Sequence, residues 1–399
     1  MVSSFLPYPL YTGGHIRLYN LIKHLSKTHE ITLICQKRDY QTKSDIEEVA
    51  KICDKVIATK RKKQWSLKNI LKTGFSTSPF LLTGHRNPEM KREIKYLLDN
   101  EKFDLIHVET FYVMQNLPAT QLPIVLVEHN VEYLVYKRFA DRAPLLLKPL
   151  LYIDVLKLKY WEEKMWKRAS RLVAVSEIEK KIMSEIRKDV VVVSNGVDTK
   201  QLTINNLQLT KDKKEKRILF IGDFKWLENR DAVEWILTSI WPLINLKLIH
   251  SASSGQNLKL ILWIVGKEIP EKIKSLGGSN IILDENAPKD TKEIFNKSYL
   301  LFAPIRIGGG TSFKILEAMA AGTPVITTQL GNEGIGASVG EEILIAKDAS
   351  DFAQKTLELL ENSKTYEKIS ENARKFIEEN YDWEKIVKKL EAVYKSVIL

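Results

Sequence analysis

The sequence predicts an α/β protein built from two doubly wound domains in succession. First, short runs of β-branched and aliphatic residues alternate with longer segments of helical pattern along most of the 399 residues. Second, these runs are apolar throughout, which is typical of parallel strands buried on both faces of a sheet. Third, the alternation stops at a polar stretch, residues 209–216, and then starts again. Two series of strand–helix units separated by such a break indicate two domains, each with its own parallel sheet.

The expected strands set the limits of the two domains. We place an N-terminal domain at residues 1–198, a C-terminal domain at residues 199–375 and a final helix at residues 376–399. Apolar side chains recur at helical spacing in this last segment, so we expect it to pack back toward the N-terminal domain. The expected strands, after a first one that ends at Phe5, are residues 31–35, 105–108, 124–128, 172–175 and 190–193, then 218–221, 260–265, 281–283, 300–303 and 324–328.

Composition excludes several classes of protein. A hydrophobic content of 44% with 28% charged residues is typical of a globular chain, and no run reaches the ~18 apolar residues that span a bilayer. The first ten residues lack the basic start of a secretion signal. The two cysteines, Cys35 and Cys53, offer neither a disulfide framework nor a metal-binding spacing, which favours a reducing compartment and therefore the cytoplasm.

The net charge of +11 indicates a preference for anionic partners. Six basic residues fall between Lys60 and Lys72 with no acid among them, and apolar residues such as Trp65 are interleaved. This segment is either a solvated helix face or a surface for an anionic membrane. Nucleic acid is not an expected partner, because no recognised binding module is present.

A glycine-rich loop at residues 308–310 is the strongest local indication of a ligand site. The preceding strand ends at Ala303, and Thr311 or Ser312 can cap the helix that follows. Such a loop presents free backbone N–H groups and the positive end of the helix dipole to an anion. A glycine loop alone also occurs as a plain tight turn, so its charged neighbours decide the interpretation.

Two cations and one carboxylate accompany this loop. Arg306 and Lys314 add positive charge, which favours a diphosphate as the ligand. Glu317 lies one turn into the helix, where its carboxylate can accept hydrogen bonds from the two hydroxyls of a ribose. An exposed ion pair between Glu317 and Lys314 is the alternative.

The order of the motifs resembles the retaining glycosyltransferases of the large group-1, or GT4-like, family, which have the two-domain GT-B fold. The resemblance covers nearly the whole chain, and the block at residues 308–325 is its most specific part. It implies a nucleotide sugar donor in a cleft between the domains, no bound metal or other cofactor, and retention of the anomeric configuration. The other matching motifs are residues 12–17, 103–108, 128–132, 174–176, 194–198, 220–223 and 264–266.

This resemblance implies roles for particular residues. Glu317 resembles the glutamate that binds the ribose, and Gly13 and Gly14 resemble a glycine loop that approaches the donor from the other domain. His129 resembles a histidine near the transferred sugar and is the one candidate catalytic residue, with a hydrogen-bonded histidine at a strand end as the alternative. The other residues assigned to the donor are Arg306, Gly309, Gly310, Thr311, Ser312 and Lys314.

Three positions depart from the family pattern. Gly309 stands where an acid often holds the sugar hydroxyls, while Asp223 and Asn229 stand where many members carry an arginine and a lysine. Other cations, Lys314 and Arg306 among them, must then neutralise the diphosphate. The departures leave open an alternative function, a nucleotide-sugar-binding protein or scaffold with the same fold and no transferase activity.

The N-terminal half also carries leucines and lysines side by side. Between Tyr133 and Arg168, a cluster of leucines at residues 145–151 is interspersed with lysines, and such a surface lies among lipid headgroups without spanning the bilayer. Packing of these leucines in the domain core is the alternative. Since many relatives take a lipid-linked acceptor, we expect a cytoplasmic enzyme, peripheral on the inner membrane face. It would transfer a hexose-type sugar from UDP or GDP to a glycan or lipid-linked glycan in cell-surface polysaccharide biosynthesis.

Overall fold

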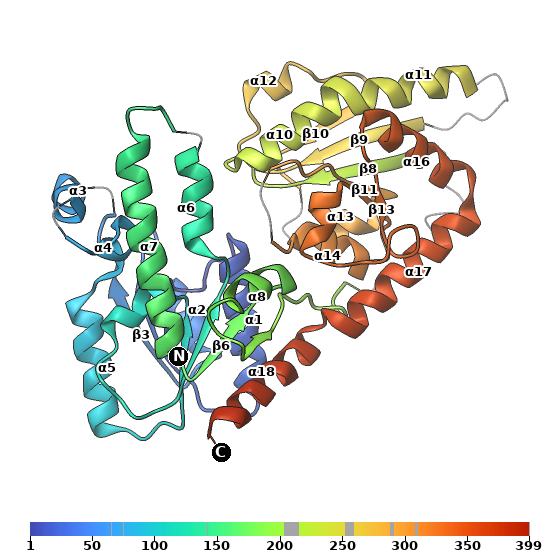
Figure 1. Ribbon diagram of the computed structural model, residues 1–399. Coiled ribbons are helices and arrows are strands. Elements are labelled where there is room, and N and C mark those ends of the chain that lie inside the picture. Colours follow the sequence, from blue (N-terminus) through green and yellow to red (C-terminus); the bar gives the residue numbers. More distant parts are fainter. Residues whose placement is uncertain are drawn as a thin grey trace. The chain divides into compact units, whose positions relative to one another are not determined.

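The computed structural model describes residues 1–64, 66–74, 76–141, 143–202, 215–251, 259–287, 291–307 and 310–398. Contacts group the chain into two compact units. Unit 1 consists of Met1–Ser194 with Ile386–Leu399, and unit 2 consists of Asn195–Lys385. Each unit contains one parallel sheet with helices on both faces (Figure 1). The prediction of two α/β domains with parallel sheets is confirmed.

In the described part of unit 1, the sheet has the strand order β3-β2-β1-β4-β5-β6-β7, and every neighbouring pair is parallel. The order changes direction between β1 and β4, which is the position where doubly wound sheets bind ligands. The strands are β1 (Val2–Ser3), β2 (Thr32–Lys37), β3 (Lys55–Lys60), β4 (Ile106–Glu109), β5 (Ile124–Glu128), β6 (Arg171–Ala174) and β7 (Val190–Val192).

The helices of unit 1 cover this sheet with their apolar faces. Helix α1 shows how the sequence directs them, because Leu18, Leu21, Ile22 and Leu25 follow helical spacing and all are buried. The helices are α1 (Gly13–Leu25), α2 (Lys43–Ala50), α3 (Leu67–Gly74), α4 (Phe80–His85), α5 (Pro88–Asn100), the 3-10 helix η1 (Phe111–Asn116), α6 (Glu132–Asp141), α7 (Lys148–Arg168), α8 (Glu177–Met183) and α18 (Trp383–Ile398).

In the described part of unit 2, the sheet has the order β10-β9-β8-β11-β12-β13, again with parallel neighbours throughout. Its change of direction lies between β8 and β11. The strands are β8 (Glu215–Ile221), β9 (Lys259–Val265), β10 (Ile281–Asp284), β11 (Leu300–Ala303), β12 (Val325–Thr327) and β13 (Leu344–Ile345).

The ends of β8 and β9 approach so closely that one position there requires glycine. A Cβ atom on Gly266 would lie 1.9 Å from the carbonyl oxygen of Gly222. The helices of unit 2 are α10 (Leu227–Trp235), the π-helix η2 (Ile236–Ile240), α11 (Trp241–Ser251), α12 (Glu271–Lys274), α13 (Thr291–Asn296), α14 (Phe313–Ala320), α15 (Gln329–Glu333), α16 (Ala349–Glu361) and α17 (Ser363–Asn380).

The basic segment at residues 60–72 is not one solvated helix face. Lys60 ends strand β3 and pairs with Asp39 at 3.0 Å, and Arg61 donates a 3.0 Å hydrogen bond to Nε2 of His85. Helix α3 begins only at Leu67. Trp65, which figured in the membrane hypothesis for this segment, lies outside the described residues. The side chains of Lys60 and Arg61 therefore both bind groups of the protein itself.

The last helix of the chain packs on unit 1. Ile386, Leu390, Val393 and Tyr394 are all buried, as their helical spacing predicts. Farther along the surface of the helix, Glu391 accepts hydrogen bonds from Thr28 Oγ1 at 2.8 Å and from His29 Nε2 at 3.1 Å. Within the ranges described above, no helix has the length and apolar character needed to cross a membrane.

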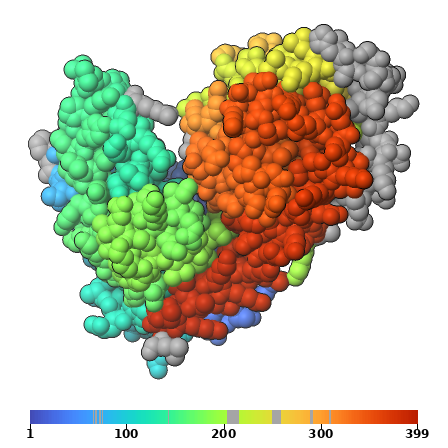
Figure 2. Space-filling view, turned by 45° about the vertical axis from the view of Figure 1, so that its right-hand side comes forward, coloured from blue at the N-terminus to red at the C-terminus, as the bar shows by residue number. Residues whose placement is uncertain are grey.

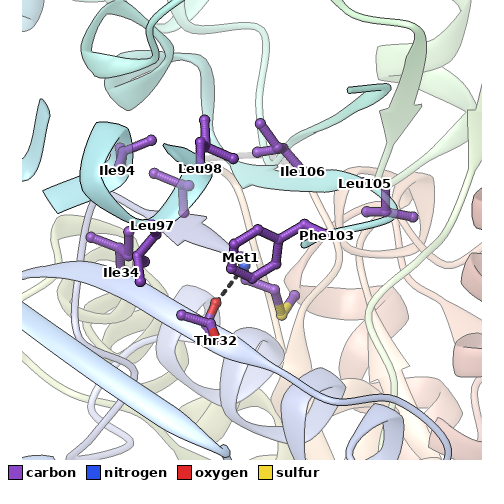
Figure 3. Close-up of a pocket in the computed structure, with 10 residues that line it drawn as sticks. Met1, Thr32, Ile34, Ile94, Leu97, Leu98, Phe103, Leu105 and Ile106 are labelled. Atoms are coloured by element: carbon purple, nitrogen blue, oxygen red, sulfur yellow. Dashed lines mark hydrogen bonds between the residues drawn. The ribbon is translucent and has the colours of Figure 1, made fainter. Parts of the chain in front are cut away.

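A small cavity of about 40 Å³ lies at the amino end of β1 (Figure 3). Apolar side chains such as Ile94, Leu97 and Phe103 line it, and the amino group of Met1 donates a 2.7 Å hydrogen bond to the carbonyl of Thr32. A larger cavity of about 630 Å³ opens at the same edge of the sheet. Ligands of doubly wound sheets bind at the opposite, carboxyl edge, so the candidate site is sought there.

We expect Leu390→Ala to lower the stability of unit 1 by about 2–5 kcal/mol, because it removes a fully buried side chain and leaves a cavity. Urea unfolding of the whole chain, followed by amide hydrogen exchange in unit 1, measures the change. The matched control is Lys389→Ala, one residue earlier on the exposed face of α18. Equal unfolding midpoints for the two variants would contradict the packing of this helix on unit 1.

Candidate functional site

The candidate residues gather at the carboxyl edges of the two sheets. In unit 1 they follow β1, β4 and β5, and in unit 2 they follow β8 and β11. Both groups therefore lie at the point where the strand order of their sheet changes direction. The two groups belong to different units, so each is a candidate site within its own unit.

The loop between β11 and α14 is held in place by a second loop. Gly310 has a φ of +80°, a conformation that glycine adopts without strain. A Cβ atom on Gly334 would lie 2.3 Å from the carbonyl oxygen of Gly310, so the two backbones are in direct contact. The hydroxyl of Thr311 donates a 2.9 Å hydrogen bond to the carbonyl of Gly334. Gly309, also assigned to the donor, lies outside the described residues.

Helix α14 begins without a side-chain cap. Ser312 occupies the N-cap position, but its side chain makes no capping hydrogen bond, and the hydroxyl of Thr311 is directed to Gly334 instead. The expected capping by one of these two side chains is therefore wrong. The N–H of Ile315 donates a 3.1 Å hydrogen bond to the carbonyl of Ser312. The first N–H groups of a helix, before this one, have no carbonyl to bond in a preceding turn, which is the arrangement that binds an anion.

Lys314 brings positive charge to the ends of β8 and β11. Its ammonium group donates a 2.7 Å hydrogen bond to Oδ1 of Asn229 and lies 4.5 Å from the ring centre of Phe220. Asn229 in turn donates through Nδ2 to the carbonyl of Asp223 at 2.8 Å. Asn229, which departs from the family pattern, is thus held by the backbone of Asp223, the other departure nearby, and gives Lys314 of α14 an uncharged hydrogen-bond acceptor. Burial lowers the pKa of Lys314 to about 8, although the nearby Glu228 carboxylate raises it.

Arg306 is already paired with an acid. Its guanidinium donates to both carboxylate oxygens of Asp231, at 2.8 and 3.0 Å, and lies 4.5 Å from the ring centre of Trp235. A bidentate pair of this kind neutralises the charge and fixes the side chain. Arg306 would have to share or exchange this partner in order to bind a phosphate. Glu317 lies on α14 one turn after Lys314 and is half-buried.

In unit 1, the start of α1 packs against His129. Thr12 caps this helix by accepting a 3.4 Å hydrogen bond from the N–H of His15, and Gly13 and Gly14 form its first two positions. A Cβ atom on Gly14 would lie 3.5 Å from Nδ1 of His129. Gly14 therefore keeps this face of the imidazole free of a side chain.

His129 follows the last residue of β5 and is hydrogen-bonded to a buried acid. Its Nε2 contacts Oε2 of Glu109, and 17% of the histidine side chain remains exposed. The hydrogen bond matches the alternative given for this residue, and the exposure leaves the ring accessible to a ligand. The sequence-based analysis missed Glu109, although it directly follows a matched motif and ends a strand beside the change of direction.

Two fully buried acids near His129 differ in charge. Burial alone would raise the pKa of Glu109, but the neighbouring His129 and His107 lower it, so the group is ionised. Glu128, at the end of β5, has a pKa raised well above its usual range by burial and by repulsion from Glu162. Glu128 accepts a 3.1 Å hydrogen bond from the indole of Trp166. Of these two acids, Glu109 is therefore the ionised one that pairs with His129.

Metal ligands are not clustered in the part of the chain that the structure covers. Among those residues, no group of three or more histidine, cysteine, aspartate or glutamate side chains could hold a metal ion.

Comparison with known families agrees with this architecture. Residues 11–201 match the family described as Glycosyltransferase Family 4, and residues 215–362 match the family described as Glycosyl transferases group 1. A Klebsiella pneumoniae protein, named only as an uncharacterized 44.6 kDa protein in the cps region, is 24% identical over 402 residues, with 97% of each chain covered.

Solved structures share the fold. A glycosyltransferase from Rickettsia africae has a TM-score of 0.66 at 16% identity and covers 100% of this chain and 98% of its own. HepE from Anabaena, in complex with UDP, has a TM-score of 0.63 at 12% identity over 99% of both chains. Another structure of HepE, with UDP-glucose, has a TM-score of 0.60 at the same identity and coverage. At these identities the likeness shows a common fold.

The lowered pKa of Lys314 predicts a pH dependence of diphosphate binding. As the pH rises through about 8, the ammonium group loses its proton, so we expect the affinity for UDP to fall. The fall is at most about tenfold per pH unit, the limit for one linked proton. Isothermal titration at several pH values measures it.

In Lys314→Met we expect weaker UDP binding at pH 7 and no such pH dependence, while binding of uridine, which lacks the diphosphate, changes little. A slope that persists in the variant would show that another group is responsible.

Proposed function

This chain belongs to the group-1, family-4-like glycosyltransferases with the GT-B fold, and we propose that it transfers a hexose-type sugar from UDP or GDP with retention of configuration. The acceptor is a glycan or a lipid-linked glycan of a cell-surface polysaccharide. The name of the Klebsiella relative, which places it in the cps region, supports this role. HepE, which shares the fold, was solved with UDP and with UDP-glucose, and this supports a uridine donor.

The observation that carries the proposed donor site is the arrangement around α14. One short helix carries Lys314 and Glu317 three residues apart, and it begins at a loop fixed by Gly334. We assign the diphosphate to the N–H groups of this loop and to Lys314, and the ribose hydroxyls to Glu317. Arg306 contributes once it shares Asp231. No metal ion is needed in this proposal, because the protein supplies the positive charge.

The proposed chemistry is stabilisation of the leaving diphosphate. As the bond from the sugar to the diphosphate breaks, negative charge accumulates on the phosphate oxygens. Donors that already point at these oxygens stabilise the transition state more than the ground state. We assign His129 to the transferred sugar, because its ring can form a hydrogen bond with one of the sugar hydroxyls.

The proposed membrane surface is the hairpin of α6 and α7, which stands out from unit 1 (Figures 1 and 2). Its tip and the outer face of α7 expose large apolar side chains, with Leu146 at 90% and Leu145 at 81% of full exposure. The alternative, that these leucines pack in the core, is wrong at the tip. The other exposed apolar residues of the hairpin are Val135, Phe139, Leu147, Leu150, Ile153, Leu156 and Tyr160.

Exposed basic side chains lie on the same two helices, namely Lys137, Arg138, Lys159, Lys164 and Lys167. Two of them are paired, Lys137 with Asp141 at 3.2 Å and Lys159 with Glu163 at 3.7 Å, while both lysine side chains stay exposed. Each basic residue near an anionic surface contributes ~1 kcal/mol of attraction. The apolar tip would enter the headgroup region while the lysines contact anionic lipids. This surface would bring unit 1 to a lipid-linked acceptor.

The transferase proposal is tested by a donor screen. We expect slow hydrolysis of at least one UDP- or GDP-sugar without acceptor, measured as released nucleotide by mass spectrometry. We also expect Glu317→Gln to weaken nucleotide diphosphate binding by about 1–3 kcal/mol, because an amide accepts the ribose hydrogen bonds less strongly than a carboxylate.

The control for this substitution is Glu361→Gln, at the exposed end of α16. Unchanged affinity of Glu317→Gln for both UDP and GDP would remove this residue from the site. Clean nucleotide binding without turnover of any donor would favour the scaffold function.

Liposome flotation tests the membrane surface. We expect the protein to float with vesicles that contain phosphatidylglycerol at low salt, and to be released at high salt as the attraction is screened. The combined change of Leu145, Leu146 and Leu150 to serine should abolish flotation. The same change at Leu227 and Leu246, which are half-exposed in unit 2, serves as the control. Flotation that is equal in both variants would contradict this surface.

A further inference from the structure

We propose that Glu109 is a positioning residue for His129, and that Tyr394 of the C-terminal helix holds Glu109 in place through His107. This inference rests on the proposed function, because it concerns which ring nitrogen of His129 meets the transferred sugar. It adds three residues, from β4 and from the far end of the chain, to a site that the sequence motifs confined to loops and helix starts.

The four side chains form one continuous series of hydrogen bonds. Tyr394 Oη lies 2.7 Å from Nδ1 of His107, and Nε2 of His107 lies 3.1 Å from Oε1 of Glu109. The second carboxylate oxygen, Oε2, contacts Nε2 of His129. His107, Glu109 and Tyr394 are all buried, so water does not replace these partners.

The chemistry of Glu109 fixes the direction of every bond in the series. An ionised carboxylate only accepts hydrogen bonds, so both histidines must carry a proton on Nε2. His107, with its proton on Nε2, accepts at Nδ1, and the hydroxyl of Tyr394 is therefore the donor. His129 is left with Nδ1 as the ring nitrogen that is available to a substrate.

Nδ1 of His129 faces the start of α1, where the chain carries no side chain. A Cβ atom at Gly14 would lie 3.5 Å from this nitrogen, and the ring of Phe5 has its centre 6.3 Å from that of His129. The absence of a side chain at Gly14 leaves an approach to Nδ1. A neutral His129 with its proton on Nε2 can accept a hydrogen bond at Nδ1 from a sugar hydroxyl.

The surroundings of Glu109 hold the carboxylate in place. The next residue, Thr110, has a φ of 62°, which is rare and strained for a β-branched residue and persists only where neighbouring contacts enforce it. Arg17, itself buried, donates hydrogen bonds to the carbonyls of Val193 and Ser194 at 2.9 and 2.6 Å. The positive charge of Arg17 attracts the negative charge of Glu109. The buried negative charge is thus balanced by groups from α1, β4 and α18.

The first test measures tautomers by 15N NMR of the histidine rings in the whole chain, without donor. We expect His107 and His129 both to carry the proton on Nε2. In Glu109→Gln the amide can donate as well as accept, so we expect His129 to populate the Nδ1–H tautomer. In Tyr394→Phe, where the Glu109–His129 contact remains, His129 should keep its tautomer while the shifts of His107 change.

The second test measures donor hydrolysis by the same variants. We expect Glu109→Gln to lower kcat about 10- to 100-fold, the range seen when an orienting partner is removed, with KM for the donor nearly unchanged. Tyr394→Phe should lower kcat only about fivefold, as for one lost hydrogen bond. A purely structural role would instead lower the amount of folded protein and leave the kcat of the folded fraction unchanged.

Three outcomes would overturn the proposal. They are a proton on Nδ1 of His129 in the unchanged protein, a Glu109→Gln variant with the tautomers of the unchanged protein, and a kcat equal to that of the unchanged protein. The first needs no variant, so it stands even if Glu109→Gln fails to fold. Because the nitrogen shifts are recorded without donor, failure to find transferase activity would count against the proposed function and leave this measurement intact.

Discussion

Parallel pairing of the strands is the constraint on which the candidate residues of both units depend. Because every neighbouring pair in both sheets is parallel, the carboxyl ends of all strands in a unit meet at one edge. In unit 1, Glu109 and Gly14 both lie close to His129, although Glu109 is 20 residues and Gly14 is 115 residues before it in the chain. In unit 2 the same rule brings Asn229 to Lys314, 85 residues later.

The candidate residues of the two units carry buried charges of opposite sign. Unit 1 buries a negative charge and surrounds Glu109 with donors, so the acid stays ionised. Unit 2 partly buries a positive charge, and Lys314 donates a hydrogen bond to the neutral oxygen of Asn229, with the Glu228 carboxylate as a nearby charge. This hydrogen bond does not neutralise the ammonium group, so its charge can act on a ligand. Arg306 differs because Asp231 already satisfies its charge. This contrast makes Lys314, rather than Arg306, the main cation of the proposed diphosphate site.

Much of the fold could be predicted from the sequence, because strands such as β5 are buried along their whole length and read as unbroken apolar runs. Strands β3 and β13 were missed for physical reasons. β3 lies at the edge of its sheet and begins and ends with exposed lysines, and β13 has only two residues. The glycine loop predicted the region of the candidate donor site. The ion pairs and hydrogen bonds that set the charge of its side chains, such as Arg306 with Asp231, join residues far apart in the sequence and therefore leave no local pattern. Glu109 was missed because an acid at a strand end does not reveal its partners.

The division of unit 1 into two separated segments has a consequence for how the protein is made. Residues 1–194 leave the ribosome before unit 2, and Ile386–Leu399 follow after the whole of unit 2. Until then, the surface that α18 covers, near Thr28, His29 and His107, stays open to water. During synthesis, residues 1–194 therefore remain incomplete, and exposed to aggregation, until Ile386–Leu399 emerge and pack on them.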